Sequence, residues 1–343
     1  MSFVQPIIYN VAILFIMMVP GIILKKCNMI KDGFGKGLSN LVLYIAQPAL
    51  IFLAYLKDYD KEIMINALFV LLFSAVAHGI FSVVTLLAFK KAPDAEGRML
   101  KFATIFSNAA FMGIPLISAV LEDTYPGATL YASIYNVIFN LCLWSLGVYI
   151  CNAGRDGNNN GIDDFQEVFD FTPDIKDIIT GKKNEGSISI LKAILHPVTI
   201  TAIIGFLFFI LPINSYVPDI LLDSLGMLKG LVAPLSMTVI GLRLADMNFK
   251  GVLKDKLMYV FIALRHFILP LAVIGIFKLT ALCGLDLHPA VILVVVIMAA
   301  APAATSATMF AEMFDCDSVY VSRLVTISTI LSIATMPLIL MLV

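Results

Sequence analysis

The sequence predicts an all-α integral membrane protein with ten transmembrane helices in two inverted repeats of five helices. Three observations predict this fold class. Apolar segments of membrane length follow one another along the chain, two of these segments are interrupted by proline, and lysine and arginine gather in alternate loops. We expect a first repeat at 1–151, a linker at 152–190 and a second repeat at 191–343.

The composition indicates the solvent of the protein. Hydrophobic residues make up 60% of the 343 residues and charged residues 14%, and the mean hydropathy is +0.96. One water-soluble core cannot bury so much apolar surface, so we expect a lipid bilayer around the chain. The net charge of −1 and the lack of a long basic run argue against nucleic acid as a partner.

Apolar windows of about 20 residues locate the ten helices. The first apolar run follows an N-terminus without the basic start of a cleavable signal, so we expect it to be a membrane helix. Because each repeat has an odd number of helices, the second repeat must enter the membrane from the opposite side. The ten windows lie near residues 7–25, 38–56, 63–89, 99–121, 128–151, 191–211, 221–245, 256–282, 289–312 and 319–342.

Two of these helices, the fourth and the ninth, contain a proline near the middle. The segments are Phe111–Pro115 and Ala300–Ala304, and their prolines Pro115 and Pro302 are 302 − 115 = 187 residues apart. Proline removes a backbone donor and clashes with the preceding turn, so we expect two half-helices in each segment. The unpaired backbone groups at such a break must be covered by protein or by a polar cavity.

Two other pairs of residues support an internal repeat. Pro48 corresponds to Pro234 at an offset of 234 − 48 = 186, and His78 corresponds to Arg265 at 265 − 78 = 187. Three pairs on nearly one offset indicate that the second half of the chain repeats the first.

The distribution of lysine and arginine predicts the orientation. These residues gather in the loops after helices 1, 3, 5, 7 and 9, whereas the other side has only Lys57, Lys61 and Lys278. By the positive-inside rule, both termini are extracytoplasmic and the linker at 152–190 is cytoplasmic.

The two breaks carry the predicted binding chemistry. The second half-helices present their N-terminal ends to the membrane midplane from opposite directions, and such ends attract an anion such as a carboxylate. A pair of kinks packed by neighbouring helices is the alternative interpretation. The expected substrate-binding residues, at the breaks and on helix 5, are Ser107, Asn108, Phe111, Gly113, Ile114, Pro115, Asn136, Asn140, Ala301, Pro302, Ala303, Thr305 and Ser306.

Five further polar residues in the membrane segments are expected to support or couple transport: Gln47, His78, Ser236, Arg265 and His266. Arg265 lies deep in helix 8, where it could attract the anion, bind a carboxylate or carbonyl, or extend toward the cytoplasmic interface. The histidines are either proton carriers or hydrogen-bonded packing residues.

The linker contains a pattern typical of calcium loops. Asp156, Asn158, Asn160 and Glu167 have the spacing of calcium ligands. Asparagine replaces two acidic ligands and the cytoplasm is poor in calcium, so a flexible polar linker is the preferred interpretation. The five cysteines show no CxxC spacing, and we expect no cofactor and no metal.

Three segments resemble the auxin efflux carrier family in its short bacterial form: Ser107–Leu116, Phe139–Gly147 and Ala301–Ser306. The resemblance implies crossed, broken helices 4 and 9, with Asn108, Gly113, Pro115 and Pro302 at the crossing. It also implies a homodimer through a scaffold of helices 1, 2, 6 and 7, a transport domain of helices 3–5 and 8–10, and a place in the bacterial inner membrane. Family substrates include auxin, malate and malonate.

The predicted function is secondary or facilitative transport of a small organic anion by alternating access. The substrate would be a dicarboxylate such as malate or malonate, or an auxin-like carboxylate. Two alternatives remain: a sodium-coupled symporter like the bile-acid carriers, and a membrane receptor that does not translocate its ligand. No HExxH, GxSxG or P-loop motif occurs in the membrane segments, so we do not expect an enzyme.

Overall fold

The structure is a computed structural model that describes residues 4–31, 33–92, 94–152, 195–211, 216–245, 255–314 and 316–343. Apart from one isolated β-bridge, the secondary structure of these residues is helical, and helices lie in all ten predicted windows. Seven helices are long and apolar enough to cross a membrane, and three apolar helices are shorter, at Ala109–Val120, Pro197–Ile210 and Pro289–Ala300. The expectation of an all-helical, multi-pass architecture is therefore confirmed.

The first half of the described chain supplies the helices of windows one to five. Single π-helical turns, labelled η, interrupt three of these windows. The elements are α1 (Val4–Ile16), α2 (Val19–Lys26), α3 (Phe34–Leu41), η1 (Val42–Ala46), α4 (Gln47–Tyr55), α5 (Lys61–Ala88), α6 (Asp94–Ile105), η2 (Ala109–Gly113), α7 (Ile114–Val120), α8 (Ala128–Cys142), η3 (Leu143–Gly147) and α9 (Val148–Asn152).

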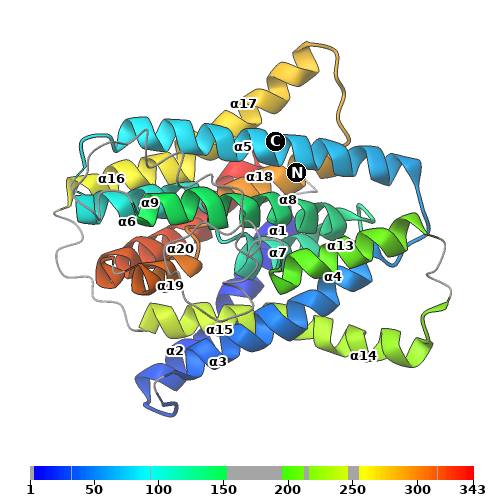
Figure 1. Cartoon of the computed structure of the whole chain (residues 1–343), viewed down its shortest axis with the longest axis horizontal. Helices are drawn as coiled ribbons and strands as arrows, with labels where there is room; N and C mark the ends of the chain where they lie inside the picture. The colour runs from blue at the N-terminus through cyan, green and yellow to red at the C-terminus, as the bar shows by residue number, and fades with distance from the viewer. Residues whose placement is uncertain are drawn as a thin grey trace, which may run out of the picture.

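The second half supplies windows six to ten in the same manner. Its elements are α13 (Pro197–Ile210), α14 (Asp219–Gly230), α15 (Val232–Ala245), α16 (Lys256–Ala263), η6 (Leu264–Ile268), α17 (Leu269–Leu282), α18 (Pro289–Ala300), α19 (Ser306–Met313) and α20 (Ser318–Leu340). Most helices run along the long axis of the molecule (Figure 1). In that view α2, α3, α14 and α15 lie along one side, α5 lies along the other, and α18 packs between α5 and α8.

The helices of the first side are held by close backbone contacts. A Cβ atom on Gly21 of α2 would lie 2.2 Å from the carbonyl oxygen of Thr238 in α15, and one on Gly241 of α15 would lie 2.0 Å from the oxygen of Met18. Each glycine therefore permits α2 and α15 to touch through their backbones, as small residues do between membrane helices.

The break in helix 4 lies upstream of the predicted position. Helix α6 ends at Ile105 and η2 begins at Ala109, so residues 106–108 form the break and the prediction of a break at Phe111–Pro115 is wrong. Pro115 lies in the first turn of α7 directly after a π-helical turn, where a missing N–H is tolerated. In helix 9 the break runs over residues 301–305 and contains Pro302, as predicted.

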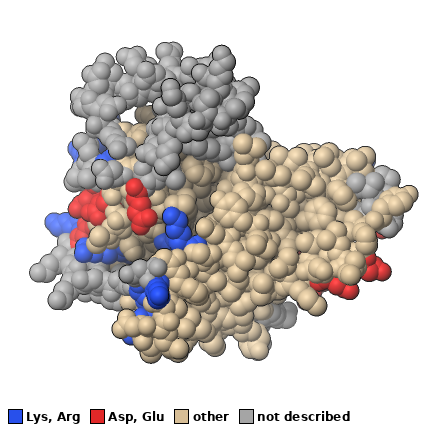
Figure 2. Space-filling model, turned by 60° about the horizontal axis from the view of Figure 1, so that its bottom comes forward, with Lys and Arg blue, Asp and Glu red and all other residues tan. Residues whose placement is uncertain are grey.

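The outer surface suits a bilayer. Figure 2 shows lysine, arginine and acidic residues gathered at one end of the visible face, acidic residues near the other end, and an uncharged region between them. Large apolar side chains such as Leu72, Leu87, Ile203 and Phe267 are exposed on the helices. A contiguous apolar surface of this kind marks contact with lipid in a chain of this composition.

An ion pair fastens two turns at the end of the molecule where α4 and α7 finish. Lys57 Nζ lies 2.5 Å from Glu122 Oε1. The carboxylate also accepts hydrogen bonds from the backbone N–H of Gly127 at 3.1 Å and of Thr129 at 2.7 Å. Burial raises the pKa of Glu122, but the hydrogen bonds from Lys57 and Thr129 together outweigh it and hold the pKa below its usual value.

The contact between α2 and α15 predicts the effect of adding a side chain at Gly241. We expect Gly241→Val to lower the free energy of unfolding by about 1–3 kcal/mol, because the new methyl groups force the two backbones apart. Gly275→Val is the matched control, since a Cβ atom on Gly275 has no neighbour within 4 Å. Thermal unfolding in detergent measures both variants, and equal melting temperatures would contradict the close packing.

The ion pair predicts a small dependence of stability on pH. Because the folded-state pKa of Glu122 lies below its unfolded value, its stabilising contribution is present at neutral pH and is lost as the pH falls through the folded pKa. Glu122→Gln should therefore be less stable than the wild type at pH 7, by at most about 1 kcal/mol given the partial exposure. The difference should shrink in acid. A difference that stays constant across the titration would rule out the carboxylate as its source.

Candidate functional site

The two breaks meet in the middle of the molecule. Ser107 and Ala303 form an antiparallel β-bridge. The backbone N–H of Asn108 donates to the oxygen of Pro302 at 2.6 Å, and the N–H of Ala304 donates to the oxygen of Phe106 at 2.9 Å. Each extended segment thus supplies partners for backbone groups that the other helix leaves open. The two interrupted helices touch at this point, and we call this contact the crossing.

Arg265 holds the helix ends on one side of the crossing. Its guanidinium is fully buried. Nε and Nη2 donate to the oxygen of Ala301 at 3.1 and 2.6 Å, Nη2 also donates to Ala299 at 2.8 Å, and Nη1 donates to Thr104 at 3.1 Å. These carbonyls belong to the last turns of α6 and α18, which have no donor within their own helices and carry partial negative charge. Of the three predicted roles, binding to carbonyls is the one observed.

His266 supports the same crossing through a serine. His266 Nδ1 lies 2.9 Å from Thr335 Oγ1, and that hydroxyl lies 3.1 Å from the oxygen of Leu331. Nε2 lies 2.9 Å from Ser328 Oγ, which accepts the N–H of Ala303 at 2.9 Å. Both ring nitrogens have partners, an arrangement that fits a packing residue better than a proton carrier.

The other predicted supporting residues, His78, Gln47 and Ser236, do not line the cavity that lies beside the crossing and is described below. His78 Nδ1 contacts the oxygen of Ser74 at 2.8 Å. Gln47 Nε2 donates to the oxygen of Ala110, at the start of the second half of helix 4. Ser236 is buried, and its hydroxyl has no hydrogen-bond partner among the described residues.

A cavity of about 60 Å³ lies beside the crossing. The cavity is bordered by the starts of the two second half-helices, which are the segment before α7 and the first turn of α19. The helices α8 and η3 and the start of α13 form other parts of its walls. Its lining consists of Leu43, Ser107, Asn108, Ala110, Phe111, Asn136, Phe139, Asn140, Leu143, Trp144, His196, Ala304, Thr305, Ser306 and Met309. The predicted residues that it brings together are Ser107, Asn108, Phe111, Asn136, Asn140, Thr305 and Ser306.

The remaining predicted binding residues do not line this cavity: Gly113, Ile114, Pro115, Ala301, Pro302 and Ala303. The last three form the crossing strand itself. Gly113 faces α18, where an added Cβ atom would lie 2.5 Å from the sulfur of Met298. Because the break lies at residues 106–108, the segment 113–115 has already turned into the packed part of the second half-helix.

Two polar residues of the cavity, Trp144 and His196, were not among the predicted binding residues. Both left a signal, because Trp144 is the single tryptophan of the chain and His196 directly precedes the proline that begins α13. Five buried polar atoms of the lining have no hydrogen-bond partner among the described residues: Ser107 Oγ, Asn108 Nδ2, Asn136 Oδ1, Trp144 Nε1 and His196 Nδ1. Buried polar atoms without partners are costly, so such a cluster indicates a place for a polar ligand.

The lining of the cavity also contains apolar side chains, and it carries no fixed charge. Phe111, Phe139 and Trp144 supply aromatic surface, and His196 is the one lining side chain that can become positively charged. Ligand pockets usually enclose about 300–1,000 Å³, so a substrate needs outward movement of side chains to enter this space of about 60 Å³.

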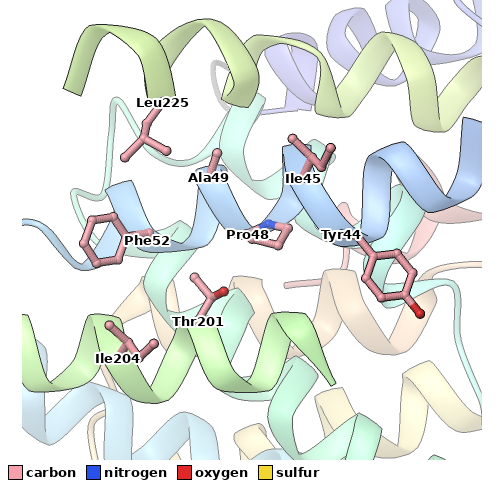
Figure 3. Close-up of a pocket in the computed structure, with 8 residues that line it drawn as sticks. All are labelled: Tyr44, Ile45, Pro48, Ala49, Phe52, Thr201, Ile204 and Leu225. Atoms are coloured by element: carbon pink, nitrogen blue, oxygen red, sulfur yellow. The ribbon is translucent and has the colours of Figure 1, made fainter. Parts of the chain in front are cut away.

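A larger groove of about 440 Å³ lies among α4, α13 and α14. Figure 3 shows Tyr44 of η1 followed by Pro48 and Phe52 of α4, with Thr201 of α13 on one side and Leu225 of α14 on the other. The Thr201 hydroxyl already donates to the oxygen of Pro197 at 2.8 Å. The groove is lined mainly by apolar side chains and offers an anion little hydrogen bonding.

The proposed calcium ligands at 156–167 lie outside the described residues. Within the described ranges, no group of three or more His, Cys, Asp or Glu side chains could hold a metal ion.

Comparison with known proteins gives two matches that agree. A family model described as membrane transport protein matches residues 6–340. A protein of Methanocaldococcus jannaschii described as an uncharacterized transporter is 23% identical over 327 residues, which cover 94% of this chain and 94% of the relative.

The contacts of Arg265 predict that the crossing depends on this side chain. Arg265→Met leaves three carbonyls without their donor at a cost of about 1–3 kcal/mol each, which the removal of a buried charge offsets in part. We expect a clear fall in melting temperature. Arg265→Lys should be intermediate, because one ammonium group cannot span all three carbonyls.

Arg323→Met is the control for these variants. Arg323 is half-buried on α20, and its Nε has no hydrogen-bond partner among the described residues. A wild-type melting temperature for Arg265→Met would show that the crossing is held by other contacts.

Proposed function

Because the chain belongs to the membrane transport protein family, the auxin efflux carrier family, we propose that it carries a small organic anion across the membrane by alternating access. It is a transporter and not an enzyme. The anion binds in the cavity beside the crossing, with its carboxylate toward the N-terminal ends of the second half-helices.

One observation carries this proposal: donors without partners converge where two helices begin. Asn108 Nδ2 and Trp144 Nε1 are buried donors on the cavity wall. The first N–H groups of a helix also have no partner within the helix and carry partial positive charge. Thr305 and Ser306 at the start of α19 add hydroxyl groups. A carboxylate accepts several hydrogen bonds at once and fits such a set.

The wall of the cavity favours one class of anion over another. A dicarboxylate brings a second full negative charge. The lining contains no lysine or arginine that could balance this charge. Burying such a charge without a partner is costly. A carboxylate on an aromatic or apolar body needs one charged end and places the rest against Phe111, Phe139 and Trp144. We therefore rank apolar monocarboxylates above malate and malonate.

Alternating access requires that some contacts break while others persist. The proposed mobile part comprises α5–α9 and α16–α20, and the proposed scaffold comprises α1–α4 and α13–α15. Arg265 and His266 bind only within the mobile part, so they would move with the crossing. Two hydrogen bonds join the two parts, one from Gln47 to Ala110 and one from Asn140 to Thr199. These residues would have to exchange partners during transport.

We further propose that the scaffold forms a homodimer and that the lysine-rich end faces the cytoplasm, with both termini outside. Two inverted repeats, at 1–151 and 191–343, account for the paired breaks. The positive-inside rule supports the orientation. An accessibility assay on single cysteines placed at Lys61 and Lys90 distinguishes the two faces.

The alternatives make different predictions. A sodium-coupled symporter would take up substrate only when sodium is present in the assay. It also needs several oxygen ligands for the ion, which are often acidic side chains, and no acidic side chain lines the cavity. A receptor that does not translocate binds the anion but gives no counterflow exchange of labelled ligand in vesicles.

The role of Asn108 can be tested by transport. In proteoliposomes we expect Asn108→Ala to reduce uptake of labelled phenylacetate by roughly tenfold or more, because a hydrogen bond to a charged group contributes about 1.5–3 kcal/mol. Uptake by the wild type should persist without sodium.

Asn40→Ala is the matched control, because Asn40 is exposed on α3. Wild-type uptake by Asn108→Ala, or failure of the wild-type protein to transport any carboxylate, would overturn the proposed site.

A further inference from the structure

We propose that His196 is the proton-binding group of the cavity, so that one proton enters the site with each carboxylate. The inference rests on the proposed function and adds the coupling ion to it. His196 is held at the start of α13, where its backbone oxygen accepts the N–H groups of Thr199 at 2.8 Å and Ile200 at 3.0 Å. Its position beside the cavity is therefore fixed by the helix that follows.

The first argument is that His196 has an unused hydrogen-bonding group where a ligand would bind. Nδ1 is buried and has no partner among the described residues, and the residue lines the cavity. His78 and His266 differ, because neither of them lines the cavity. His78 Nδ1 has a backbone partner although its Nε2 has none among the described residues, and His266 has partners on both nitrogens. Among these three histidines, His196 is the one placed to bind an anion.

The second argument is charge. On the elements that line the cavity, the charged side chain is Glu312 of α19, which is exposed. Arg243 reaches α19 but donates to the hydroxyl of Thr308. Tyr44, Tyr131, Tyr135 and Cys142, on η1 and α8, are ordinarily neutral near pH 7. No fixed cation of the described lining therefore balances the carboxylate.

The third argument is the order of events. Burial disfavours the charged form of an imidazole when the cavity holds no anion. A carboxylate nearby favours that form, because opposite charges in a poorly solvated site attract strongly. The anion and the proton thus stabilise each other, and each raises the affinity of the site for the other by the same factor. In the loaded site the imidazolium donates from Nδ1 to the carboxylate, and the pair carries no net charge.

The single tryptophan gives a direct assay. Because Trp144 lines the cavity, a bound ligand should change its fluorescence, and phenylacetate is a suitable aromatic monocarboxylate probe. For the purified full-length protein, we expect the dissociation constant to rise by about tenfold per pH unit on the alkaline side of the titration. In a weakly buffered solution at pH 7.5, binding should take up about one proton per anion.

Three variants separate coupling from folding. His196→Gln should bind phenylacetate more weakly, with a dissociation constant that does not depend on pH and no proton uptake. His196→Arg provides a positive charge that does not titrate near neutral pH, so it should bind without taking up a proton. His288→Gln is the control: His288 caps α18 outside the cavity, and its variant should keep the wild-type pH dependence.

The outcomes distinguish this inference from the function on which it rests. Wild-type binding with no pH dependence and no proton uptake would overturn the role of His196 and leave the anion site intact. A wild-type pH dependence that persists in His196→Arg would overturn it equally. The absence of any response to phenylacetate or to malonate in the wild type, at every pH, would contradict the proposed function itself.

Discussion

The structure depends on one constraint: two helices are interrupted inside the protein, and every backbone group at the interruptions needs a partner. In a membrane no bulk water can serve that purpose. Arg265 meets the constraint on one side by donating to the carbonyl oxygens of Thr104, Ala299 and Ala301. The two broken segments meet it in the middle by hydrogen-bonding to each other. The crossing is thus held by one cation and a single antiparallel β-bridge.

The two sides of the crossing are unequal, and this inequality directs the chemistry. The C-terminal ends of α6 and α18 share a fixed positive charge, so their partial negative charges are balanced within the protein. The N-terminal ends of the second half-helices face a cavity whose lining has no fixed charge and several polar atoms without partners. What is missing on that side is negative charge, which is why an anion is the substrate class proposed.

Local sequence patterns could predict much of the fold but less of the site. Hydropathy located a helix in each of the ten windows, and the family resemblance is confirmed over nearly the whole chain. Proline misled the placement of the first break, because Pro115 follows a π-helical turn that accommodates it. Asn108 and Thr305 could be predicted because they flank the breaks. Trp144 and His196 could not be placed from sequence spacing, since the cavity joins helices that lie far apart along the chain. The role of Arg265 likewise depends on three carbonyls brought together only by folding.

A structure with a bound ligand tests the central claim most directly. Crystals grown with 4-bromophenylacetate would locate the bromine by its anomalous scattering and the carboxylate by its density. The account predicts the carboxylate within hydrogen-bonding distance of Asn108 Nδ2 and Trp144 Nε1, with the ring against Phe111 and Phe139. A bromine peak confined to the apolar groove among α4, α13 and α14, with no density beside the crossing, would contradict it.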